Sequence, residues 1–225
     1  MYLVEIGRWM ALRVLGSAPG WLWLTGCLLG LPVLRALSPE GILSPGDAQP
    51  ALPAQAAFLA SLTGMMLATG RLLQNDWLLE RGGAQRRLLA QSVALLSTGL
   101  VGAVLVLAGN LIPSSSASPA PLEPGQLLAI LLACVHLAAL GATLLQLPPG
   151  LPGLPLALPL AGWVLPALLP PGTPDLLLRL LAIPRADLPA DITGVLATLA
   201  PILFWAGLAT LTARDRAASS RPLMR

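Results

Sequence analysis

Runs of about 20 mostly apolar residues recur along this chain, and they constrain its fold more than any other feature. A helix of that length crosses the roughly 30 Å hydrocarbon core of a bilayer. The runs are found near residues 14–34, 51–69, 88–112, 127–147, 154–170 and 192–213. Six spans leave few of the 225 residues for anything else. The sequence therefore predicts an all-α integral membrane protein with about six transmembrane helices, as a single polytopic domain over 1–225.

The distribution of charge predicts how these spans are oriented. Lys and Arg are enriched in the cytoplasmic connections of membrane proteins. The segments with excess arginine are 1–13, 70–87 and 214–225. The segments with excess acid are 35–50, 113–126 and 171–191. With the neutral loop 148–153, this is the order that six spans require. We therefore expect both termini and the 70–87 segment to face the cytoplasm. Anionic lipids satisfy such arginines, so the basic composition does not call for a nucleic-acid partner.

The first 13 residues predict an amphipathic helix that lies in the membrane interface. The residues that fall at helical spacing are Leu3, Ile6, Trp9, Met10 and Arg13. Glu5 and Arg8 are turned away from them. Such a helix lies along the headgroup layer before the chain turns inward. The alternative is that this segment only extends the first span into the cytoplasm.

Two segments in the C-terminal third of the chain differ from ordinary apolar transmembrane helices. The proline-rich run 154–170 predicts either a broken helix that lines a pathway or an ordinary bent helix, because proline removes a helix hydrogen bond. Between residues 171 and 191, the stretch DLLLRLLAI is apolar but too short to cross a bilayer. It predicts a re-entrant or interfacial hairpin on the outer face, before the last span.

The residue types exclude several kinds of chemistry. All 13 basic residues are arginine, whereas a Walker A loop and a Schiff base each need a lysine. No catalytic set and no cofactor are predicted, so we do not expect an enzyme. The one histidine, His136, lies in the fourth span and is a functional candidate by position. One histidine cannot form a zinc site. Haem ligation, proton transfer and a hydrogen bond between helices remain open for it.

Residues 74–89, QNDWLLERGGAQRRLL, hold five charged residues in a chain that is only 10% charged. Asp76 and Glu80 lie one helical turn apart, with Trp77 beside them. Since Trp and Arg are frequent binding anchors, the loop predicts a docking site for another protein. The predicted docking residues are Asp76, Trp77, Glu80, Arg81, Arg86 and Arg87. A plain topogenic loop would explain the arginines but not the acids, the tryptophan or the paired glycines.

The order of these features resembles the membrane subunits of type-2 ABC exporters. Glu80 and Arg81, the glycine pair Gly82–Gly83 and RRLL at 86–89 match that family's loop loosely. AQRRLLAQSV stands where the family commonly has a Ser-Pro pair. The chain length also resembles that of the haem-exporter membrane subunit of cytochrome c maturation. The resemblance implies a bacterial-type cytoplasmic (inner) membrane, a separate cytoplasmic ATPase subunit that holds the ATP, and a second membrane subunit, identical or paralogous. The outer hairpin would then form a gate with Asp175, Arg179 and Arg185.

Two functions from different classes therefore stand as expectations. The first is the transmembrane subunit of an ABC-type export complex for a hydrophobic or amphiphilic substrate, because the spans offer no charges for an ionic one. The second is a non-transporting structural or assembly subunit of a larger membrane complex. The scarcity of polar residues in the spans favours the second, whereas the glycine pair and the outer hairpin favour the first.

Overall fold

The computed structural model describes residues 2–37, 52–74, 83–112, 124–146, 161 and 192–219. Every regular element in these ranges is an α-helix. The helices are α1 (Tyr2–Leu15), α2 (Ala18–Leu37), α3 (Leu52–Gln74), α4 (Ala84–Asn110), α5 (Pro124–Leu145) and α8 (Ile192–Ser219). The predicted all-α class therefore holds for the described part of the chain.

Two of the described helices are long and apolar enough to cross a membrane. They are Gln85–Asn110 within α4 and Pro124–Leu145, which is α5. The number of candidate crossings rises to three if α1 and α2, which meet at 83°, together form one broken span. The predicted spans 51–69 and 192–213 fall on α3 and α8, whereas 154–170, apart from residue 161, and the outer hairpin lie outside the described residues. A prediction of about six spans is therefore not confirmed.

The predicted first span, 14–34, is interrupted near its start. α1 ends at Leu15 and α2 begins at Ala18. The Ser17 hydroxyl donates to Val14 O at 2.6 Å and accepts the Gly20 amide at 3.2 Å, which caps the new helix. A side chain at Gly20 would meet the carbonyl oxygens of Val14 and Leu15. Only a glycine fits this tight corner, so the chain turns there instead of continuing as one helix.

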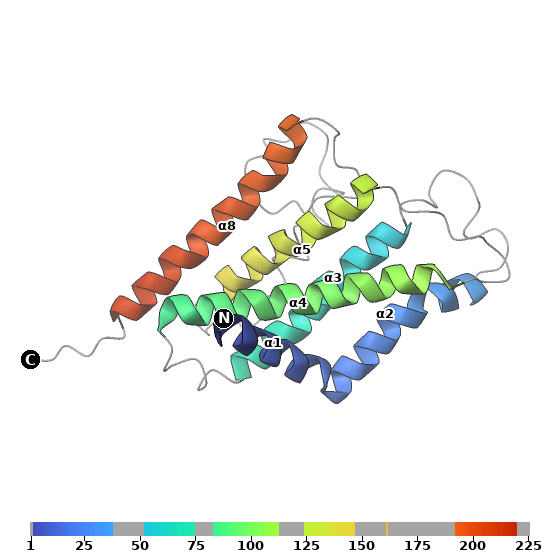
Figure 1. The fold of residues 1–225 in the computed structure, drawn as a ribbon, viewed down its shortest axis with the longest axis horizontal. Coiled ribbons are helices and arrows are strands. Elements are labelled where there is room, and N and C mark those ends of the chain that lie inside the picture. Colours follow the sequence, from blue (N-terminus) through green and yellow to red (C-terminus); the bar gives the residue numbers. More distant parts are fainter. Residues whose placement is uncertain are drawn as a thin grey trace, which may run out of the picture.

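Figure 1 shows α4 at the centre of the arrangement, and α4 contacts each of the other described helices. α1 lies along its first half and α2 along its second half, while α3 runs antiparallel to it. Glycines allow these close approaches. A Cβ on Gly7 of α1 would lie 2.7 Å from the Val93 side chain, and one on Gly109 of α4 would collide with Leu28 O of α2. Small side chains at helix contacts are how helices pack closely in lipid.

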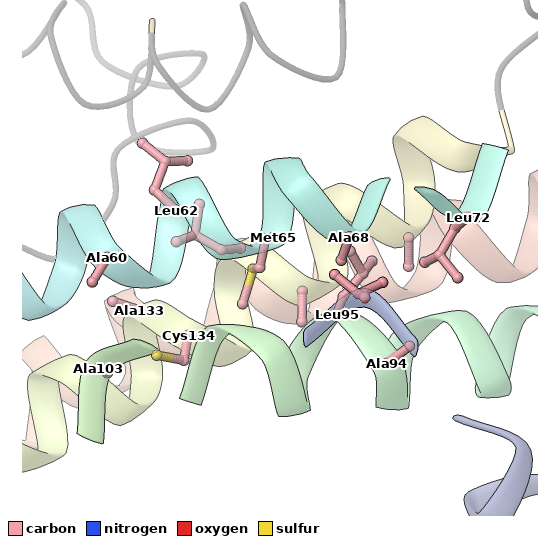
Figure 2. Packing of buried hydrophobic residues seen from close by; sticks show 14 of the residues in the cluster. Ala60, Leu62, Met65, Ala68, Leu72, Ala94, Leu95, Ala103, Ala133 and Cys134 are labelled. Atoms are coloured by element: carbon pink, nitrogen blue, oxygen red, sulfur yellow. The ribbon is translucent and has the colours of Figure 1, made fainter. Parts of the chain in front are cut away.

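The core lies between α3, α4 and α5. Figure 2 shows Met65 and Ala68 of α3 facing Leu95 of α4, with Cys134 of α5 close by. Alanine and leucine dominate this cluster. Because lipid tails are as apolar as leucine, these contacts stabilise the bundle by close packing more than by removal from water.

Candidate functional site

The charged loop joins α3 to α4, and the structure describes only its last part. Asp76, Trp77, Glu80 and Arg81 lie outside the described residues. Gly83 is the N-cap of α4 and has a φ of 79°, a left-handed conformation that glycine adopts without strain. A Cβ at Gly83 would meet no heavy atom within 4 Å. The second glycine of the pair therefore serves the backbone turn into α4 rather than a close contact.

The first turn of α4 is strongly positive. It carries Arg86, which is exposed, and Arg87, which is half-buried. It contains no acidic residue, and Gly83 supplies no side-chain cap. A helix N-terminus already has a partial positive charge, so two arginines there oppose the helix dipole. An acidic group from another segment or another protein, placed over this turn, would offset the unfavourable interaction between the arginines and the helix dipole.

One end of the bundle gathers most of the described arginines. The start of α4, the end of α3, the end of α8 and the helix α1 lie toward the same end of the long axis (Figure 1). We call this the arginine-rich end. Its arginines include Arg8, Arg71, Arg86, Arg87 and Arg214. The connection between α3 and α4 begins and ends here, and four of the six predicted docking residues fall in it by sequence.

Of the other predicted residues, only His136 lies in the described part. Asp175, Arg179 and Arg185, assigned to an outer gate, lie outside it. His136 is on α5 and has no exposed surface. The described residues contain no group of three His, Cys, Asp or Glu side chains that could hold a metal ion.

Sequence reasoning missed a set of polar contacts that join the helices inside the bundle. Gln146 Nε2 donates to Gln91 Oε1 at 2.9 Å, and the Thr143 hydroxyl donates to Trp205 O at 2.8 Å. Ser61 Oγ lies 3.1 Å from Cys134 Sγ. Gln146 directly follows α5, so these contacts link α5 and its C-terminal end to α4, α8 and α3 respectively. These polar side chains therefore hydrogen-bond to neighbouring helices.

Arg35 forms a further contact that the sequence did not indicate. It lies in the last turn of α2, and its guanidinium donates to both O and Oδ1 of Asn110, the last residue of α4. The basic group thereby satisfies carbonyls at a helix C-terminus, where the dipole favours positive charge. This arginine therefore ties α2 to α4.

The described part of the chain is all-helical, and two of its helices, or three crossings with the bent pair α1–α2, are long and apolar enough to span a membrane. Comparison of the chain with protein families, with curated proteins and with solved structures gives no match.

Proposed function

We propose that this chain is the transmembrane subunit of an ABC-type export complex whose separate ATPase subunit docks on residues 76–87. The observation that carries the proposal is the position of the two helix ends that this loop joins. α3 ends and α4 begins toward the arginine-rich end, and the first turn of α4 bears Arg86 and Arg87 and contains no acidic residue. A cytoplasmic partner whose surface carries acids opposite Arg86 and Arg87, and basic side chains opposite Asp76 and Glu80, complements this segment.

The first two helices support the same proposal. α1 is a separate helix set at 83° to α2, as expected for an amphipathic segment that lies in the interface before the first crossing. The structure adds which side chains of α1 face the bundle and which do not. Trp9 is exposed, whereas Gly7, Met10 and Val14 pack inward.

The directions of α5 and α8 support a further membrane crossing between them. Both run toward the arginine-rich end (Figure 1). A return crossing between them, where the sequence places its proline-rich fifth span, completes this topology. In the proposed complex two membrane subunits enclose the pathway, and ATP hydrolysis on the partner shifts them between inward-open and outward-open packings.

A second function, a structural subunit with a static partner at the same loop, is favoured by one observation. α2, α3 and α4 interlock through backbone contacts at Gly109 and through an indole held between Gly64 and Gly102. Such packing suits a rigid scaffold, since closely packed elements do not slide continuously.

Alanine at both Asp76 and Glu80 is expected to reduce the amount of partner that copurifies by about tenfold or more. Losing one charge from a paired contact costs about 2 kcal/mol or more, beyond the 1.4 kcal/mol of a tenfold change. The measurement is quantitative mass spectrometry of the tagged chain purified in mild detergent. The matched control is Asp47→Ala with Glu123→Ala, two acids in segments predicted on the other side. If both double variants copurify the same amount of partner, the loop does not dock that partner.

A further inference from the structure

α1 has two faces with different neighbours. One face packs inward and consists of Gly7, Met10, Ala11 and Val14, at positions i, i+3, i+4 and i+7 of the helix. A Cβ at Gly7 would lie 2.7 Å from the Val93 side chain and 2.9 Å from Ala90 O. α1 is therefore fixed against the first half of α4 and cannot roll to exchange its faces.

The other face mixes charged and apolar side chains. Trp9 is 48% exposed and Leu12 is 66% exposed, and both lie beside the exposed Arg8 and Arg13. The Arg13 guanidinium carbon sits 5.5 Å from the centre of the Trp9 ring, within cation–π range. No described helix covers this face.

We propose that this face of α1 binds the headgroups of anionic phospholipids. In the hydrocarbon core Arg8 and Arg13 would lose their hydration, and Glu5, exposed one turn before Arg8, carries only one negative charge against their two, so at least one guanidinium would be left without a counter-charge. In bulk water Trp9 and Leu12 would remain exposed. The headgroup layer solvates both kinds of group, and its phosphates are complementary to guanidinium donors. The angle of 83° between α1 and α2 directs α1 along that layer when α2 crosses it.

This inference does not depend on the ATPase proposal, because α1 and the loop 76–87 are different segments. Arg8 and Arg13 are exposed, so changing them removes charge without opening the core. Arginine near an anionic surface contributes about 1 kcal/mol, which corresponds to about fivefold in affinity for each side chain.

The test titrates the full-length protein in zwitterionic detergent with phosphatidylglycerol or with phosphatidylcholine of the same acyl chains. Bound lipid is counted by native mass spectrometry. We expect phosphatidylglycerol to bind more tightly, and Arg8→Gln with Arg13→Gln to weaken it about 25-fold. Phosphatidylcholine binding is expected to stay unchanged, and 0.5 M salt should weaken only the anionic lipid.

Matched single variants give the control. Arg13→Gln is expected to weaken phosphatidylglycerol about fivefold, whereas Arg35→Gln removes the same charge from a side chain bonded to Asn110 and should change little. Arg13→Lys keeps the charge and should retain binding. Equal binding of the two lipids by the unaltered protein would overturn the proposal without any variant. Competition by free inorganic phosphate at the same concentration as the lipid would also overturn it, since the site would then take a soluble anion.

Discussion

Replacing Trp23 with alanine is expected to destabilise the bundle by roughly 2–3 kcal/mol. The Trp23 indole of α2 lies in a notch formed by Gly64 of α3 and Gly102 of α4, where a Cβ at Gly102 would come 2.5 Å from the ring. Its Nε1 donates to the Thr63 hydroxyl at 3.0 Å. The two glycines cannot fill the space that the ring leaves, so Trp23→Ala creates a cavity and removes a hydrogen bond.

The matched control for this prediction is Trp21→Ala on the same helix. Trp21 is 63% exposed, and removing a side chain that packs against little should change the stability by about 0.5 kcal/mol or less. Both variants are compared with the unaltered protein by the midpoint of SDS-induced unfolding in mixed micelles. If the two tryptophan variants shift that midpoint equally, the notch does not hold α2 against its neighbours.

Alanine at Gly109 is expected to force α2 and α4 apart and to cost about 1–3 kcal/mol. The Cβ of this alanine would collide with the carbonyl oxygen of Leu28. A backbone atom in a helix cannot swing away as a flexible side chain does, so the whole of α2 has to move. The shift would also disturb the contact of Arg35 with Asn110, which lies next to Gly109.

Gly26→Ala is the control for the glycine prediction. Gly26 is on α2, and a Cβ there would meet no heavy atom within 4 Å. Alanine has the higher helix propensity, by about 1 kcal/mol, so this variant is expected to unfold at the same or a slightly higher SDS concentration. A Gly109 variant as stable as the Gly26 variant would show that α2 and α4 do not meet at this point.

The sequence was sufficient to predict the helices but not their neighbours. The runs 88–112 and 127–147 coincide with α4 and α5 because a long apolar stretch in lipid must satisfy its own backbone hydrogen bonds. Trp21 and Trp23 look alike in the sequence, as two interfacial aromatics. Only Gly64 and Gly102, about 40 and 80 residues further along, distinguish the packed ring from the exposed one.

The break between α1 and α2 had a local signal that the hydrophobic pattern obscured. Ser17 is a favoured N-cap residue, and Pro19 follows in the first turn of the new helix. The pairing of Gln91 with Gln146 had no such signal, because a hydrogen bond between helices depends on how they are placed in space. The docking residues from Asp76 to Arg81 remain a prediction, supported by the charge around the start of α4.

The measurement that tests the central proposal most directly is the identity of the partner bound at the arginine-rich end. The tagged chain is isolated from native membranes in mild detergent, and its stoichiometric partners are identified by mass spectrometry. The export proposal predicts a cytoplasmic ATPase subunit at one copy per copy of this chain, lost when Asp76 and Glu80 are alanine. Recovery within a large membrane complex that contains no ATPase would contradict it, and would make this chain a structural subunit.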